Sequence, residues 1–271
     1  MHLDDKKLLI RDTVLQPDYD AYYSCSTAKK GYSGTAVFVK RHGKNNKKQA
    51  TLDSFFGAKK ADKKDEKKQE TDNIDPDDVT NLIPTDVSYK MGVDDHDQEG
   101  RLIIADFPLF SLVNLYVPNS GQKLERLDYR TEQWDKDLLK FVQAKSKPVV
   151  WLGDLNVAHT NLEVWNDGAK HLAKQAGVTQ QERDSFQHQL DTSGFQDAFR
   201  ALHPTAKGCY SYWSQRAGNR EPNKGLRLDY FCCASELFDD SNKVVARDSY
   251  MLYDVHGSDH CPVVLELEIK K

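Results

Sequence analysis

Residues 148–156 read Pro-Val-Val-Trp-Leu-Gly-Asp-Leu-Asn. The short apolar run that ends at Gly153 predicts a buried strand, and the polar side chains of Asp154 and Asn156 follow at its end. Two oxygen-bearing side chains at a strand end can point into one cavity and offer ligands to a hard cation. A turn stabilised by the Asp or Asn side chain explains the same residues equally well. The stretch therefore predicts a buried strand and, at its end, either a site or a turn.

Further strands and helices are expected on both sides of this stretch. Residues 101–107 and 110–117 are strand-like, and the short Pro108-Leu109 link between them predicts an antiparallel hairpin. Strand patterns also occur at residues 34–40, 227–233 and 261–269, and helical spacing at residues 3–16, 124–144 and 179–192. The last helix has Thr179 as its expected N-cap, with Glu182 three residues later. The mixture indicates a layered α/β or α+β sandwich.

The composition divides the chain into parts. Of all residues, 38% are hydrophobic and 30% charged, so part of the chain is expected to stay outside the core. Residues 41–86 are rich in Lys, Asp, Glu, Gln and Asn, which predicts a disordered insertion. It would separate residues 1–40 from residues 87–271, both belonging to one folded domain. The net charge of -4 predicts no global basic field.

The cysteines and the apolar runs favour an intracellular location. The five cysteines form no CxxC pair, so neither a disulfide framework nor a zinc site is expected. Reduced thiols are typical of the cytosol or nucleus. No apolar run approaches the roughly 20 residues that a membrane span needs. We therefore expect a soluble intracellular protein.

Two further motifs carry groups suited to catalysis. Residues 257–262 read Gly-Ser-Asp-His-Cys-Pro, and the His260 imidazole beside Asp259 suits proton handling, although many such pairs are surface loop residues. Asp229 lies in an apolar strand, where a buried carboxylate needs a partner. That partner would be an imidazole, which the carboxylate would orient, or the adjacent Arg227.

The order of these motifs resembles the exonuclease III-like apurinic/apyrimidinic (AP) endonucleases of the endonuclease/exonuclease/phosphatase superfamily. The resemblance covers nearly all of the chain outside the insertion. It rests on residues 30–35, 87–89, 96–101, 115–121, 126–130, 151–159, 210–213, 225–231 and 257–262. It implies a four-layer α/β sandwich with two packed mixed sheets. It also implies hydrolysis of the phosphodiester 5′ to an abasic site in base excision repair, with 3′–5′ exonuclease or 3′-phosphodiesterase activity in addition.

The resemblance implies roles for individual residues. Asp154 would position or deprotonate the attacking water, His260 would lie near the scissile phosphate, and Asp229 would orient His260. The implied catalytic set is Tyr116, Asp154, Asn156, Asp229 and His260. The implied ligands of Mg²⁺, with Mn²⁺ as the alternative, are Asp154, Asn156, Asp259 and His260.

A second implied set concerns DNA. Its members would contact phosphates, enter the minor groove or wall the pocket for the flipped abasic sugar, and they are Gly31, Tyr32, Ser33, Arg101, Asn119, Tyr212 and Trp213. Extrusion of an abasic sugar is cheap because no base pairing is lost. The family often has Trp before its RLDY motif, where this chain has Leu226. This departure predicts a looser pocket with altered exonuclease or repair side activities.

The insertion contains a motif of its own. Residues 49–56 fit the pattern Q-x-x-L-x-x-F-F, which resembles the peptide that binds the replication sliding clamp (PCNA). A short helical turn would place Leu52, Phe55 and Phe56 in an apolar pocket while Gln49 forms hydrogen bonds. A chance match, or packing on the domain, is the alternative. The flanking lysines are consistent with nuclear import and with DNA attraction, and a nuclear location is expected.

The chain departs from the family at its start. Family members begin with a strand that carries an Asn, followed by a strand that ends in a Q-E-T-like motif whose Glu is a principal metal ligand. Residues 2–7 correspond to the segment after that Glu, so we expect the first strands to be missing. An N-terminally incomplete AP endonuclease is favoured over an inactive or weakly active form that binds DNA or the clamp. A relative acting on lipid or inositol phosphates is disfavoured by the motifs at residues 31–34 and 212–213.

Overall fold

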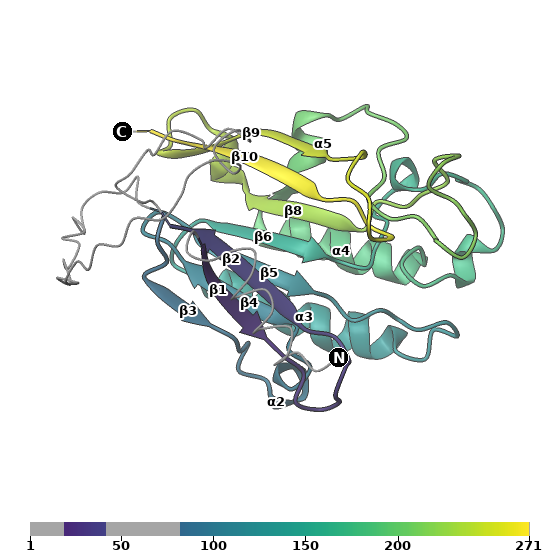
Figure 1. The fold of residues 1–271 in the computed structure, drawn as a ribbon, viewed down its shortest axis with the longest axis horizontal. Helices are drawn as coiled ribbons and strands as arrows, with labels where there is room; N and C mark the ends of the chain where they lie inside the picture. Colours follow the sequence, from purple (N-terminus) through teal and green to yellow (C-terminus); the bar gives the residue numbers. More distant parts are fainter. Residues whose placement is uncertain (1–18, 42–81, 271) are drawn as a thin grey trace, which may run out of the picture.

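The computed structural model describes residues 19–41 and 82–270. Their centre is a six-stranded mixed sheet (Figure 1). In spatial order its strands are β3 (Asp86–Ser88), β4 (Leu102–Asp106), β5 (Ser111–Tyr116), β6 (Val149–Asp154), β8 (Asp229–Ala234) and β7 (Phe195–Asp197). Strands β5 and β6 are parallel, and the other neighbours are antiparallel. The predicted strand before Asp154 and the predicted hairpin of β4 and β5 are confirmed.

Two antiparallel hairpins lie over one face of this sheet (Figure 1). One joins β1 (Tyr19–Ser24) to β2 (Thr35–Lys40), and the other joins β9 (Val244–Met251) to β10 (Val263–Ile269). Both contribute apolar side chains to a core with the central sheet, and these include Val39, Leu265, Leu112, Val150 and Phe231. The expected second mixed sheet is thus represented, in the described residues, by two separate antiparallel hairpins.

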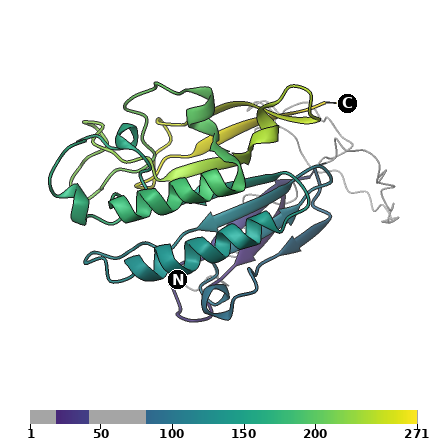
Figure 2. The same cartoon turned by 180° about the vertical axis from the view of Figure 1, so that it is seen from behind.

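Helices cover the other face of the central sheet (Figure 2). Helix α3 (Asp135–Gln143) continues the π-helical segment η2 (Tyr129–Trp134), and α4 (Gln180–Ser193) runs beside it. Their apolar sides bury Trp134, Leu138 and Phe186 against Trp151 of β6. Thr179 and Glu182 form the predicted capping box, and Gly194 ends the helix at φ 70°.

Shorter elements complete the described chain. They are α2 (Asp94–Asp97), η3 (Asn161–Glu163), η4 (Leu172–Lys174), α5 (Ala198–Leu202) and η5 (Ser235–Phe238). None of the helices in residues 19–41 and 82–270 has the length and apolarity needed to cross a membrane.

The ends of the predicted insertion can be compared with the structure. Leu82 packs against the core and Asp86 begins β3, so residues 82–86 belong to the folded domain and not to a disordered insertion. The rest of the insertion from residue 42, the predicted helix at residues 3–16 and the clamp-like motif Gln49, Leu52, Phe55 and Phe56 lie outside the described residues.

Candidate active site

Three predicted catalytic side chains form a row across the central sheet. In the strand register, Tyr116 of β5 lies opposite Asp154 of β6, and Asp154 lies opposite Asp229 of β8. Side chains alternate between the faces of a strand, so Asp154 shares the hairpin face with Val150, while Trp151 packs on the helix side. Neighbouring strands therefore bring a phenol and two carboxylates together at one end of the sheet.

Gly153 allows the close strand approach that positions Asp154. Its φ is 130°, a conformation that L side chains rarely adopt, and an added Cβ would lie 1.9 Å from the carbonyl oxygen of Leu115. The motif Gly-Asp-Leu-Asn therefore begins with a residue that geometry requires to be glycine.

Asp154 and Asn156 form a turn that also faces the site. The backbone N–H of Asn156 donates to Oδ1 of Asp154 (2.9 Å), and its side-chain amide donates to Oδ2 (3.2 Å). Asn156 has φ 49°, a left-handed conformation that is uncommon for a residue other than glycine and often marks functional sites. The turn considered from the sequence is therefore present, and the role of these side chains as cation ligands stays a prediction.

The environment of Asp154 favours its protonated form. Burial and the neighbouring charge of Asp229 raise its pKa to about 7, although His260 and the N–H of Asn156 act in the opposite direction. A carboxyl group with a pKa near 7 can accept a proton at neutral pH.

His260 is paired with Asp229. Its Nδ1 lies 2.7 Å from Oδ2 of Asp229. Ser211 fixes this part of β8, because its hydroxyl accepts a hydrogen bond from the backbone N–H of Asp229 (3.1 Å). Burial lowers the pKa of His260, but the hydrogen bond and charge of Asp229, together with Asp154 and Asp259, raise it to about 9. At neutral pH His260 is therefore an imidazolium.

Arg227, the other partner considered for Asp229, is engaged elsewhere. Its guanidinium donates to Asp197 (2.5 Å) and to Glu163 (2.9 Å), and all three side chains are buried. The ion pairs of Arg227 with Asp197 and Glu163 therefore stabilise the folded domain and do not involve Asp229. The partner of the Asp229 carboxylate is the imidazole of His260.

Arg130 is a site residue whose role the sequence did not reveal. It is buried on η2, pairs with Asp135, and donates to the carbonyl oxygens of Leu155 (2.8 Å) and Asn156 (3.1 Å). These hydrogen bonds fix the backbone of the turn that follows Asp154. Its motif at residues 126–130 was noted, but the contact spans two distant segments and has no local signal.

Arg101 does not occupy the position predicted for a direct DNA contact. Only 3% of it is exposed, and it is ion-paired with Glu99 (2.5 Å). Its guanidinium lies over the rings of Tyr32 (5.4 Å) and Tyr116 (4.8 Å) and donates to the Tyr32 hydroxyl (2.9 Å). Arg101 thus links the loop at residues 31–34 to the catalytic row.

Trp213 lies mostly in the core. Only 3% of it is exposed, which leaves little of its surface for the DNA contact predicted from the sequence. Tyr212 is half-buried, and its ring lies 5.0 Å from that of His260. Leu226, which replaces the family's frequent Trp, is bridged to Tyr212 by the backbone. Tyr212 is therefore the aromatic side chain beside the imidazole, and Leu226 packs with Tyr212 in a neighbouring core cluster.

The remaining predicted DNA contacts lie at the edge of the row. Asn119 is exposed, and its amide donates to Oδ1 of Asn156 (2.8 Å). Gly31 is exposed and Tyr32 half-buried, while the hydroxyl of Ser33 donates to the Glu99 carbonyl oxygen. These residues can reach a ligand that covers the row.

The described residues offer an incomplete set of metal ligands. Asp154 fits, because a cation would offset the burial and the repulsion from Asp229 that raise its pKa. Oδ1 of Asn156 already accepts a bond from Asn119, and Nδ1 of His260 is bonded to Asp229. In residues 19–41 and 82–270, no three His, Cys, Asp or Glu side chains are grouped to hold a metal. The predicted ligands Asp154, Asn156, Asp259 and His260 therefore do not form a complete metal site by themselves.

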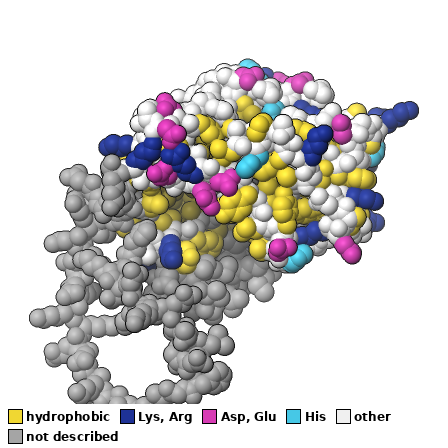
Figure 3. All heavy atoms as spheres, turned by 90° about the horizontal axis from the view of Figure 1, so that it is seen from above, with side chains coloured by type: hydrophobic (Ala, Val, Ile, Leu, Met, Phe, Trp, Pro, Cys, Tyr) yellow, Lys and Arg dark blue, Asp and Glu magenta, His cyan; other side chains and the backbone are white. Residues whose placement is uncertain are grey.

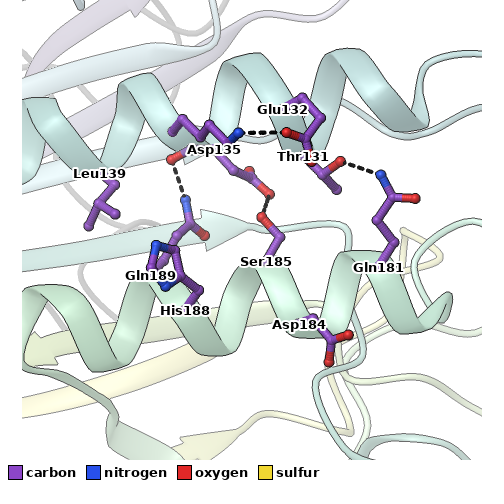
Figure 4. Close-up of a pocket in the computed structure, with 10 residues that line it drawn as sticks. Thr131, Glu132, Asp135, Leu139, Gln181, Asp184, Ser185, His188 and Gln189 are labelled. Carbon is purple, nitrogen blue, oxygen red and sulfur yellow. Dashed lines mark hydrogen bonds and ion pairs between the residues drawn. The ribbon is translucent and has the colours of Figure 1, made fainter.

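A hollow on the helix side of the central sheet lies where two helices pack against each other. It measures about 390 Å³ between α3 and α4, and polar side chains from the two helices point toward one another there (Figure 4). Ser185 donates to Asp135 (2.8 Å) and Gln181 to Thr131 (2.8 Å). These mutually bonded groups lie across the sheet from the catalytic row.

The surface on the β9–β10 side carries both apolar and charged side chains. Figure 3 shows apolar side chains interspersed with separate basic and acidic groups on this face. The exposed apolar residues of the chain include Leu252, Tyr253 and Val255, which lie in the loop before His260.

Comparison with known proteins decides the family. Residues 69–260 match the model of the endonuclease/exonuclease/phosphatase family. The chain is 38% identical over 270 residues to an exodeoxyribonuclease of Bacillus subtilis, an alignment that covers 98% of this chain and 87% of that protein. The chain belongs to this family, among the AP endonuclease and exodeoxyribonuclease members.

Other members of the family extend the comparison. The chain is 34% identical to the DNA repair nuclease APEX1 of Danio rerio, with 97% of this chain and 70% of that protein covered. The AP endonuclease LMAP from Leishmania major has the same fold, with a TM-score of 0.71, 28% identity, and coverage of 94% of this chain and 72% of that one. The predicted family is confirmed, and its members depend in general on a divalent metal.

Proposed function

We propose that this family member is a DNA-(apurinic or apyrimidinic site) endonuclease that hydrolyses the phosphodiester 5′ to an abasic site. The observation that carries the proposal is the row of Tyr116, Asp154 and Asp229 with His260 paired at its end. Relatives of this chain in Dictyostelium discoideum and Arabidopsis thaliana are named as endonucleases of this kind, which supports the choice of substrate.

The chemistry assigned to the row is hydrolysis by an aligned water. Asp154, with its pKa near 7, orients the water and accepts its proton as the oxygen attacks phosphorus. The bond from phosphorus to the 3′ oxygen of the preceding nucleotide breaks, and that oxygen leaves and takes up a proton from solvent. His260 is held as an imidazolium by Asp229, and its Nε2–H would donate to a phosphate oxygen as negative charge develops there. Asn156 holds both carboxylate oxygens of Asp154 in one orientation.

Mg²⁺, with Mn²⁺ as a substitute, is the cation we propose. Asp154 would hold it, and it would supply charge stabilisation to the phosphate. Its removal by a chelator tests this part of the proposal.

Recognition of the abasic sugar is assigned to Tyr212, whose ring lies beside the imidazole, and to Leu226, which packs with Tyr212. A base-free deoxyribose fits against an aromatic and an aliphatic side chain, whereas a base would need more room. Leu226 is smaller than the tryptophan frequent in the family, so 3′–5′ exonuclease and 3′-phosphodiesterase activities are proposed as additional. Tyr32, Ser33 and Asn119, at the edge of the row, would contact the DNA backbone.

Cleavage of a defined duplex tests the function. The purified chain, given Mg²⁺ and a duplex with one abasic site, is expected to cut 5′ to that site. His260→Gln should reduce the rate by at least about 100-fold. The matched control is His203→Gln, because His203 is also paired with an aspartate (Asp248, 2.8 Å) but outside the row. Equal rates for the two variants would reject the assignment.

The same experiment distinguishes an active endonuclease from the alternative, an inactive form that binds DNA. A chain that binds abasic duplex yet does not cut it would be the inactive DNA- and clamp-binding form. The incomplete ligand set of the described residues is the observation that favours this alternative.

On sequence grounds, we propose the sliding clamp as a partner of the chain and the nucleus as its location. The motif residues Gln49, Leu52, Phe55 and Phe56 provide the apolar and hydrogen-bonding groups that such a contact needs. Phe55→Ala with Phe56→Ala should abolish clamp pull-down and leave cleavage of short duplexes unchanged. Retained pull-down would reject the motif as the clamp contact, and imaging of the tagged full chain tests the location.

A further inference from the structure

We propose that Arg220 is a positioning residue for His260. It fastens the loop at residues 252–258 that leads directly into Asp259 and His260. The inference rests on the proposed function, in which His260 acts on the phosphate.

The loop has little apolar burial to hold it. Every residue from 252 to 258 is exposed, and Leu252, Tyr253 and Val255 are 38%, 42% and 46% exposed. A hollow of about 520 Å³ is lined by Trp213, Arg220 and Tyr253, and the ring of Tyr253 meets that of Trp213 edge-on (6.2 Å between ring centres). A segment with so little burial is expected to fluctuate unless polar contacts fix it.

Arg220 supplies those contacts. Its guanidinium donates to the carbonyl oxygens of Tyr253 (3.0 Å), Val255 (2.6 Å) and Ser258 (3.1 Å). These three acceptors span nearly the whole loop. One side chain therefore ties its beginning, middle and end together.

The guanidinium is itself held in place. It lies 5.0 Å from the ring centre of Trp213, which is buried and therefore provides a fixed surface. The backbone N–H of Trp213 donates to the carbonyl oxygen of Asp259 (2.8 Å). Trp213 and Arg220 thus anchor the segment on both sides of Ser258.

The anchoring reaches the imidazole through a short path. The backbone N–H of His260 donates to the hydroxyl of Ser258 (3.1 Å). Ser258 lies three residues after Val255, whose carbonyl oxygen Arg220 binds most closely. Movement of Ser258 would move the backbone of His260 and weaken its bond to Asp229. A planar guanidinium can donate to three carbonyl oxygens, whereas a lysine ammonium is a single point and would retain only part of the anchoring.

Kinetics of Arg220→Gln test the role. Because small misplacements of catalytic groups are costly, kcat on abasic duplex should fall about 10- to 100-fold with KM little changed, and Arg220→Lys should recover part of the loss. Arg216→Gln is the matched control, since it removes one positive charge from the same segment; its kcat should be unchanged. A change confined to KM would overturn the proposal.

A double variant gives the sharper test. If Arg220 acts through His260, adding Arg220→Gln to His260→Gln should produce no further loss in single-turnover rate. Effects that multiply would show that Arg220 acts independently and would refute the inference.

Hydrogen exchange tests the anchoring without catalysis. Arg220→Gln should speed amide exchange at residues 252–260 and leave the exchange of β5 and β6 unchanged. Unaltered exchange of the loop would reject the anchoring. This result is obtained whether or not the chain cuts abasic DNA, so failure of the inference and failure of the proposed function are distinguishable.

Discussion

Asp229→Asn is expected to move the whole pH profile of cleavage to lower pH. In the wild-type chain the environment raises the pKa of His260 from 6.5 to about 9, which corresponds to about 3 kcal/mol in favour of the imidazolium. This stabilisation is fully present below pH 6.5 and is lost as the pH rises through about 9. Asn removes the charge that contributes most of it, while the burial that lowers the pKa remains.

The same substitution also affects the acid side of the profile. The charge of Asp229 helps to raise the pKa of Asp154 to about 7, so its removal lets Asp154 ionise at lower pH. In the proposed mechanism, cleavage needs ionised Asp154 and protonated His260. Both limbs of the bell-shaped profile should therefore shift in the same direction.

Two measurements check this prediction. One is the rate of incision of abasic duplex between pH 5 and 10, and the other is an NMR titration of the His260 ring. Asp248→Asn, which removes the aspartate beside His203, is the control and should leave the profile unchanged. An alkaline limb that stays in place in Asp229→Asn would refute the pairing as the source of the imidazolium.

Three further predictions concern stability and the metal. Gly153→Ala should lower the free energy of unfolding by at least about 2 kcal/mol in urea titrations, because its Cβ would collide with the Leu115 carbonyl; an unchanged midpoint would contradict this. Glu163→Gln should cost about 3 kcal/mol, since it breaks a buried pair with Arg227. The pKa of Glu163 is held at about 2, so its contribution is present above pH 4.5 and lost as the pH falls through 2; equal acid sensitivity of the variant would argue against it. Chelation by EDTA should abolish incision and added Mg²⁺ should restore it, whereas full activity in EDTA would exclude the proposed cation.

Local patterns allowed part of the fold to be predicted. The apolar run before Asp154, the capping box of Thr179 and the short link between β4 and β5 each depend on neighbouring residues, and each is present. The strand β9 was not predicted, because its sequence Val-Val-Ala-Arg-Asp-Ser-Tyr-Met alternates poorly and a register shift interrupts its pairing with β10. Its formation depends on a partner distant in sequence.

The candidate site could likewise be predicted only in part. The roles of Asp154, Asp229 and His260 were implied by the family resemblance that their motifs carry, and the structure brings the three side chains together. The burial of Arg101 and Trp213 was not implied, because it arises from contacts such as Arg101 with Tyr32 across 69 positions. Residue type indicated that these side chains matter but could not say whether they face DNA or support those that do.

The relative cleavage of abasic and intact DNA tests the central claim most directly. Single-turnover rates would be measured for the 271-residue chain with Mg²⁺ on an abasic duplex, on the same duplex with an intact base, and on a phosphoinositide. We predict a single cut 5′ to the abasic site, at least about 100-fold faster than cleavage of either other substrate. Equal cleavage of the two duplexes, or faster turnover of the phosphoinositide, would contradict the assignment of the row formed by Tyr116, Asp154 and Asp229 to abasic DNA.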